Sequence, residues 1–186
     1  MQSPHGFIAE PLDGKLYDNV AKSGLILSTS IDSFQTTNRI AVIKVLPSGY
    51  SGVIQVDAHA IVHHNTFRKG LDMKGKEQFS TSYFEGDTYL VDPSTIYMYM
   101  NPDMKDWKTL GEWCFVAPVL NDNNLQTATL KDLHGTVVYG NDALDAQVGD
   151  EIVFITDSEY EFNIDEKILY RIESKDICLK KKQPES

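Results

Sequence analysis

Histidines are the residues of this chain whose type would suit metal binding or acid–base chemistry. His63 and His64 are adjacent in a predicted strand, so their side chains are expected to point to opposite faces and not to share one metal ion. His59 and His63 have no acidic partners at a recognisable ligand spacing. We therefore predict ordinary surface or core histidines and no metal site, with His134, beside Gly135, as a turn residue.

Carboxylates gather in two places, residues 142–151 and 159–166. Neither place has the ligand order and central glycine of a calcium-binding EF-hand, so we predict a solvated acidic face. Asp57 and Asp150 are predicted to hold turns through side-chain to backbone hydrogen bonds. The sequence has no Gly-x-Ser-x-Gly motif, phosphate-cradling loop or Cys–His catalytic pair, which predicts a protein that is not an enzyme and binds no cofactor.

The formal net charge of -10 over 186 residues argues against a nucleic-acid-binding protein, which usually presents a Lys/Arg stripe. Several aromatic residues could be taken for a base-stacking platform, but this charge favours packing or subunit contacts. They are Tyr83, Phe84, Tyr89, Tyr97 and Tyr99.

Apolar windows and cysteine content indicate where the protein is located. No window approaches the apolar length that a membrane span needs, and we predict no membrane interaction. Two cysteines do not make a disulfide framework, and Cys178 lies in an apolar strand, where a thiol acts as a small hydrophobe. A reducing, cytoplasmic location is predicted.

Alternation of apolar and polar residues dominates the chain, as in residues 39–45 and 136–139. This period of two predicts short β-strands, and glycine and proline punctuate them. Such spacing is typical of small barrels or a sandwich. No long amphipathic helix is apparent, so we predict an all-β protein.

Internal repetition organises these strands. Residues 148–182 have a fainter echo at residues 56–99, and the start of each half repeats as Phe-Ile-Ala-Glu-Pro and Phe-Val-Ala-Pro. The polar, proline-containing stretch 101–106 is the predicted boundary. The halves are therefore residues 1–101 and residues 106–182.

Two segments occur in the first half only. One is the connection at about residues 13–37, in which polar residues flank Leu25, Ile26 and Leu27. The other is residues 70–82, which we interpret as an excursion or extended hairpin.

The string VGDEIVFITDSEYEFNIDEKILYRIESKDICL resembles the C-terminal half of a GroES-type co-chaperonin. KSGLILST, at residues 22–29, is similar to the mobile loop of that family, with small residues followed by an aliphatic tripeptide. The resemblance covers most of the chain if two family domains lie in tandem. It implies two tandem GroES-like β-barrels, the first carrying the mobile loop and the second lacking it. Medium-chain alcohol dehydrogenases also contain a GroES-like domain, but the glycine-rich turn of their dinucleotide-binding domain is missing here.

The resemblance also implies a function. Gly24, Leu25, Ile26 and Leu27 would bind a chaperonin ring, and this chain would cap that ring during ATP-dependent folding, with ATP bound by the chaperonin. It would self-associate into a homo-oligomeric ring, a heptamer being the expected number. A divergent duplicated form suggests a bacteriophage co-chaperonin, acting in the host cytoplasm.

Alternatives stay open at two levels. Leu25, Ile26 and Leu27 could instead form a short strand packed in the barrel. The whole protein could be a non-enzymatic structural or virion assembly protein that reuses the barrel, because a fold does not determine a function.

Overall fold

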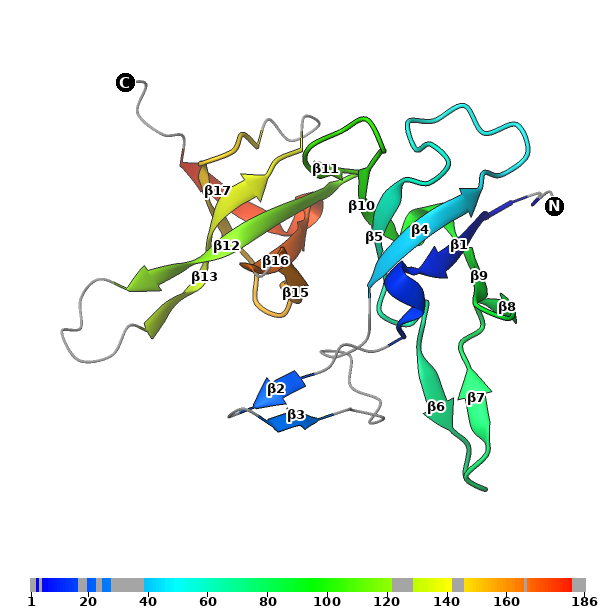
Figure 1. Cartoon of the computed structure of the whole chain (residues 1–186). Coiled ribbons are helices and arrows are strands. Elements are labelled where there is room, and N and C mark those ends of the chain that lie inside the picture. The colour runs from blue at the N-terminus through cyan, green and yellow to red at the C-terminus, as the bar shows by residue number, and fades with distance from the viewer. Residues whose placement is uncertain are drawn as a thin grey trace. The chain divides into compact units, whose positions relative to one another are not determined.

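The structure is a computed structural model that describes residues 3, 5–16, 20–22, 25–27, 39–121, 129–141, 146–165 and 167–181. The described residues form β-strands and three-residue 3-10 helices (Figure 1). The predicted all-β class is therefore confirmed. Within this part of the chain we find no helix with the length and apolar character that crossing a bilayer would require.

The chain divides into two compact units, Met1–Trp107 (unit 1) and Lys108–Ser186 (unit 2). Asn101 opens the stretch that the sequence predicts as a boundary, and it is buried in unit 1. Its side-chain amide accepts a hydrogen bond from the Gln55 N–H (3.0 Å) and donates one to the Val53 carbonyl (2.9 Å). Polar composition alone does not reveal that this asparagine fastens a turn of the first unit.

Six strands of unit 1 belong to a seven-stranded sheet with the order β11-β10-β5-β4-β1-β9-β8, in which β11 begins just after Trp107, the last residue of unit 1. All the pairings given below for this sheet are antiparallel. Its strands are β1 (Phe7–Pro11), β4 (Ile40–Val45), β5 (His59–Val62), β8 (Tyr83–Glu85), β9 (Thr88–Val91), β10 (Ile96–Met100) and β11 (Lys108–Thr109).

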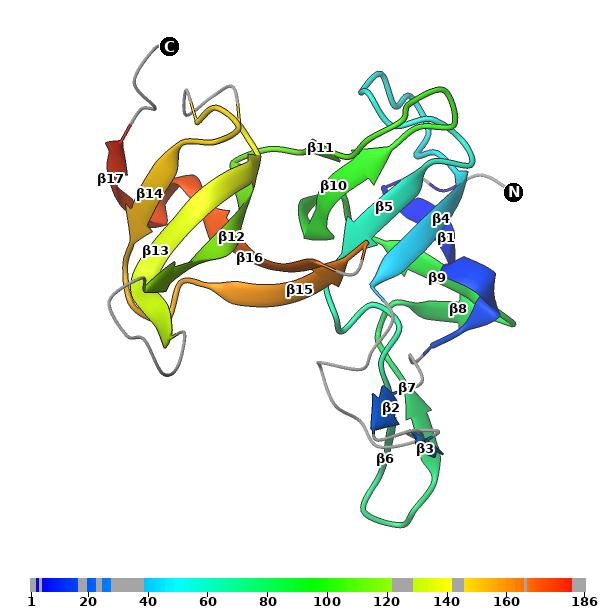
Figure 2. The same ribbon diagram turned by 60° about the vertical axis from the view of Figure 1, so that its left-hand side comes forward.

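Unit 2 is built on a six-stranded sheet with the order β15-β16-β12-β13-β14-β17, also antiparallel. Figure 2 shows β12, β13 and β14 lying side by side in this sheet. The strands are β12 (Trp113–Asn121), β13 (Thr129–Tyr139), β14 (Glu151–Phe154), β15 (Tyr160–Ile164), β16 (Lys167–Glu173) and β17 (Ile177–Lys181).

The two sheets share one topology. Apart from β11, the order β8-β9-β1-β4-β5-β10 of unit 1 matches β15-β16-β12-β13-β14-β17 of unit 2, strand for strand in chain order. A 3-10 helix precedes the last strand in both units, η2 (Pro93–Thr95) in unit 1 and η4 (Ser174–Asp176) in unit 2. The echo in the sequence therefore corresponds to a repeated arrangement of strands.

A turn before the third strand repeats down to its hydrogen bonds. In unit 2 the Gly149 N–H donates to the Val137 carbonyl and the Val137 N–H to the Asp150 carbonyl, both at 2.8 Å. In unit 1 Asp57, Ile43 and Ala58 make the same two bonds at 2.6 and 2.9 Å. The turn needs a positive φ, which is 94° at Gly149 and 62° at Asp57. Aspartate is among the few residues besides glycine that tolerate this conformation, so unit 1 keeps the turn without the glycine.

The aspartates of this turn act differently from each other. The Asp150 side chain accepts a hydrogen bond from the Gln147 N–H (3.0 Å), so its predicted role in the turn is confirmed. The Asp57 side chain instead bonds the Lys44 Nζ (3.0 Å) across the solvent-exposed surface.

Strand register aligns the two units more accurately than the sequence does. Ala9 pairs with Ile43 and Tyr89, and Val116 pairs with Val137 and Tyr170. By this register Pro11 corresponds to Pro118, whereas Phe7 corresponds to Cys114 and not to Phe115. The sequence comparison is therefore one residue out at the start of this strand.

Neither large sheet closes on itself within the described residues. The seven-stranded sheet ends at β11 and β8, and the six-stranded sheet ends at β15 and β17. The two GroES-like barrels thus stay a prediction.

Two hairpins form small sheets of their own. One pairs β2 (Val20–Lys22) with β3 (Leu25–Leu27), and the other pairs β6 (Lys69–Leu71) with β7 (Glu77–Phe79). In both Figure 1 and Figure 2 the β6–β7 hairpin projects away from the large sheet of unit 1. The predicted excursion at residues 70–82 lies in this hairpin and the turn that follows it.

Aromatic and aliphatic side chains fill each unit separately. In unit 1 the largest fully buried side chains include Phe7, Phe67 and Tyr89. In unit 2 one buried cluster consists of Cys114, Val116, Val137, Ala146, Ile152, Phe154 and Ile172.

The two thiols have opposite environments. Cys114 is buried, and burial raises the pKa of its thiol to about 12. Cys178 is exposed, which corrects the prediction that it acts as a small hydrophobe in an apolar strand. The register between β17 and β14 shifts at this residue, since Ile177 pairs with Phe154 and Leu179 with Val153. Cys178 is the extra residue of a β-bulge, and such a residue is left unpaired.

This difference predicts a selective thiol reaction. Ellman's reagent at pH 8 is expected to titrate Cys178 in the native protein and to reach Cys114 only after denaturation, because the reagent needs an accessible thiolate. The Cys178→Ser variant should give almost no rapid reaction until denaturant is added. Rapid native labelling of that variant would show that Cys114 is accessible.

His134 also departs from its prediction as a turn residue. It lies within β13, opposite Val153 of β14, and its Nδ1 is 2.9 Å from the Glu151 Oε1. The backbone irregularity is at Leu133, whose φ is 61°. Gly135 is instead required by close packing. A sequence pattern does not distinguish a glycine required by packing from a glycine required by a turn.

Candidate functional site

The residues predicted to bind a partner lie in the β2–β3 hairpin. Leu25, Ile26 and Leu27 form β3, and they pair with Lys22, Ala21 and Val20 respectively. Gly24 lies outside the described residues. The aliphatic tripeptide is thus one strand of a two-stranded antiparallel sheet.

This hairpin is inserted between two strands that are themselves neighbours. It follows β1 and precedes β4, and β1 pairs directly with β4. In unit 2 the corresponding strands β12 and β13 pair as far as Asn121 and Thr129, so their connection is only residues 122–128. Since paired neighbours need only a short turn, the long connection of unit 1 is not required by the sheet.

The hairpin bears on both alternatives for the tripeptide. Residues 25–27 are extended, as a packed strand would be, but β3 belongs to the two-stranded sheet and not to the seven-stranded sheet. Most of the predicted polar tether on either side of these residues, at residues 17–19, 23–24 and 28–38, lies outside the described part of the chain. Partner binding by this segment stays a prediction.

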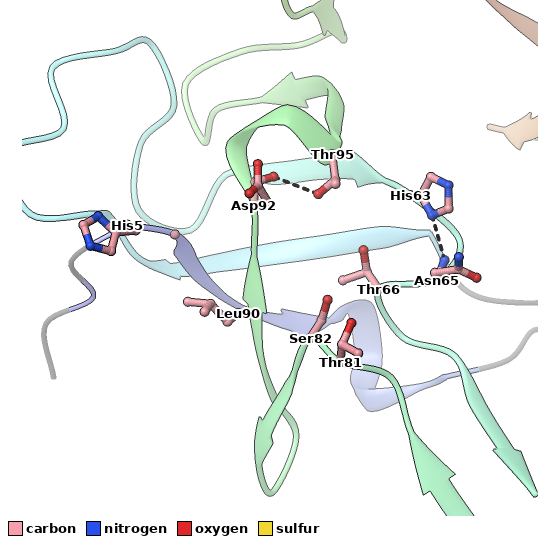
Figure 3. Close-up of a pocket in the computed structure, with 10 residues that line it drawn as sticks. His5, His63, Asn65, Thr66, Thr81, Ser82, Leu90, Asp92 and Thr95 are labelled. Carbon is pink, nitrogen blue, oxygen red and sulfur yellow. Dashed lines mark hydrogen bonds between the residues drawn. The ribbon is translucent and has the colours of Figure 1, made fainter. Parts of the chain in front are cut away.

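A polar groove of about 290 Å³ is the second candidate in unit 1. Figure 3 shows His5 and His63 well separated, with Asp92, Thr66 and Ser82 between them. The groove is lined by His5, Gly6, His63, Asn65, Thr66, Thr81, Ser82, Leu90, Asp92 and Thr95. Hydroxyl and imidazole groups at such a surface can form hydrogen bonds with a polar ligand.

Hydrogen bonds within the groove mostly hold its own backbone. The Asp92 Oδ1 accepts from the Ser94 N–H (2.8 Å) and the Ser94 hydroxyl (2.6 Å), and the Thr95 hydroxyl donates to the Asp92 carbonyl (2.7 Å). The bond from the Ser94 hydroxyl, together with that from its N–H, lowers the pKa of the Asp92 carboxyl from its ordinary value. Asp92 therefore caps the 3-10 helix η2, which is a structural role.

The adjacent histidines are arranged differently from their prediction. β5 ends at Val62, so His63 and His64 follow the strand, and their rings are 4.2 Å apart at 31°. The His63 Nδ1 accepts a hydrogen bond from the Asn65 N–H (3.1 Å). Among the described residues no three His, Cys, Asp or Glu side chains gather as a metal site would require.

No motif in the sequence indicates the groove. Its residues come from four separate stretches of unit 1, near residues 5, 65, 82 and 92. The pairing of β1 with β9, of β5 with β10 and of β8 with β9 brings these stretches together.

Comparison of the chain with known proteins finds neither a matching protein-family model nor a matching curated protein.

Proposed function

We propose that this protein is a co-chaperonin, which caps a chaperonin ring through the β2–β3 hairpin and has no catalytic activity of its own. The observation that supports this most is the position of Leu25, Ile26 and Leu27. They form an extra hairpin in the connection between β1 and β4. The corresponding connection of unit 2 consists only of residues 122–128. In the proposal the two units are GroES-like barrels, and the first unit alone carries the partner-binding segment.

The energetics of such a hairpin suit reversible capture. Complete burial of each aliphatic side chain would contribute about 1.5–3 kcal/mol, whereas ordering a loop costs about 1–2 kcal/mol per residue. Pairing of β3 with β2 reduces the number of residues that remain to be ordered. One hairpin would still bind weakly, but several hairpins on one ring would gain avidity.

The proposed assembly is a homo-oligomeric ring, a heptamer by the family resemblance, with terminal strands pairing between neighbours. The position of β17 supports this, because it is the last strand of its sheet and pairs with β14 along one edge. We place the protein in the cytoplasm, of the host if the chain is encoded by a bacteriophage.

Co-sedimentation with a chaperonin ring, with and without ATP, tests this function. The wild-type protein should bind only with nucleotide, and Leu25→Asp/Ile26→Asp/Leu27→Asp should abolish binding because aspartate does not transfer into an apolar groove. Val53→Asp/Val56→Asp/Val148→Asp is the matched control, since these exposed aliphatic residues lie outside the hairpin. It should bind like the wild type.

Two results would contradict the proposal. Binding that ignores both nucleotide and the triple aspartate variant would remove the hairpin from the mechanism. Intact assembly with no chaperonin binding under any nucleotide condition would instead favour a structural or virion assembly protein.

A further inference from the structure

The β6–β7 hairpin, residues 69–79, is a rigidly anchored arm. Phe79 at its base stacks on Tyr83, with ring centroids 4.1 Å apart at 16°. Tyr83 contacts Tyr89 edge-on at 5.6 Å, and Tyr89 contacts the fully buried Phe67 at 4.9 Å. Aromatic contacts of this kind stabilise a fixed geometry, so the arm is joined to the core of unit 1 by a continuous row of rings.

Hydrogen bonds from the backbone to the Asp72 side chain and to the backbone also order the tip of the arm. The Asp72 Oδ1 accepts from the N–H groups of Lys74 and Lys76, both at 2.8 Å. The Asp72 N–H bonds the Lys76 carbonyl (2.8 Å), and Gly75 supplies the positive φ of 76° that the turn needs. A tip held in this way can bind without a large ordering cost.

The tip exposes apolar and basic side chains together. Met73 is completely exposed and Leu71 is 71% exposed, so this short hairpin presents two large apolar side chains to solvent. Lys74 and Lys76 follow Met73 in the chain, whose formal net charge is -10. A surface with this combination fits a partner that is both acidic and apolar.

The solvent face of the β15–β16 ribbon in unit 2 has that character. Phe162 and Ile164 of β15 are buried, so the alternate residues Glu161 and Asn163 face solvent. They pair with Tyr170 and with Ile168, which is 52% exposed. Glu159 precedes the strand and is also exposed.

The charges on this ribbon influence their neighbours. Burial, followed by the charges of Glu161 and Glu159, raises the pKa of Tyr170 above its ordinary value. β15 is also the terminal strand of the six-stranded sheet. The ribbon therefore combines an acidic strip, an exposed isoleucine and a sheet edge.

We propose that the arm of one subunit docks on the β15–β16 ribbon of a second copy of this chain, with Lys74 and Lys76 opposite Glu159 and Glu161 and with Met73 against Ile168. Two different surfaces of the same chain make a head-to-tail contact, which gives a ring when the rotation between successive copies closes. This contact is additional to the pairing of terminal strands in the proposed assembly. It does not depend on chaperonin binding, and it is tested without a chaperonin.

Charge-reversal variants test the contact, with the affinity between copies measured by native mass spectrometry and sedimentation. The wild-type protein should assemble, and Lys74→Glu/Lys76→Glu or Glu159→Lys/Glu161→Lys should each raise the dissociation constant by roughly tenfold or more, because like charges then meet. The variant with all four changes should recover most of the wild-type affinity. Lys15→Glu/Lys105→Glu, which makes the same charge change at exposed sites elsewhere, should assemble like the wild type.

Cross-linking then identifies the copy that the arm contacts. Met73→Cys in one copy and Ile168→Cys in an isotopically heavy copy, both with Cys178→Ser, should form disulfide-linked dimers of mixed mass on oxidation. A monomeric wild-type protein, no effect of either charge reversal, or cross-links confined within one chain would each overturn the proposal.

Discussion

Gly135→Ala is expected to lower the free energy of unfolding of unit 2 by about 1–3 kcal/mol, because the new methyl group would overpack the sheet. A Cβ at Gly135 would lie 2.7 Å from the Val116 Cβ and closer still to its Cγ2. Val116 is completely buried, so it has no space into which to move. Urea denaturation followed by circular dichroism measures the loss.

Unit 1 suggests a second substitution that should offset the loss of stability caused by Gly135→Ala. By strand register Gly135 and Val116 correspond to Ala41 and Ala9 of unit 1, which are both fully buried. Val116→Ala alone should also destabilise, because it leaves a cavity. Val116→Ala/Gly135→Ala recreates the pair of unit 1, so it should cost less than the sum of the two single changes, by about 0.5–3 kcal/mol. Additive losses would show that the two positions do not compensate each other.

Phe67→Ala is expected to cost about 3–5 kcal/mol of stability in unit 1, the usual loss for a buried aromatic residue. Phe67 has no exposed surface, and its ring contacts Tyr89 edge-on with centroids 4.9 Å apart at 86°. The change should lower the urea midpoint of unit 1 and leave the transition of unit 2 in place.

Phe84→Ala is the control of the same chemistry. Phe84 lies in β8 and is 58% exposed, so its removal should change stability by no more than about 0.5 kcal/mol. Equal losses at Phe67 and Phe84 would mean that burial in the structure does not govern their contributions.

Strand content and repetition could be predicted from local patterns. Residues 39–45 alternate and contain β4, and residues 136–139 alternate within β13. Residues 148–182 and 56–99 were paired by sequence, and the turns at their starts, residues 148–150 and 56–58, make the same hydrogen bonds. These features depend on residues close together in the chain, which is why a sequence pattern detects them.

Local irregularities of the strands could not be predicted from the sequence pattern. A β-bulge at Cys178 exposes a residue that alternation assigned to the interior. A close approach of Val116 explains Gly135, where a turn was the simpler interpretation. Both depend on the register of a neighbouring strand, which an isolated stretch of sequence does not contain.

The sequence by itself determined that the chain is all-β, that its two halves are related and that Leu25, Ile26 and Leu27 lie in the unmatched connection. Only the tertiary structure decided the order of the strands, the assembly of the polar groove and the pairing of Gly135 with Val116. Alternation specifies which face of a strand is buried but not which strand lies beside it. Some neighbours in these sheets are distant in sequence, since β1 pairs with β9 and β12 with β16, and packing of the whole unit selects them.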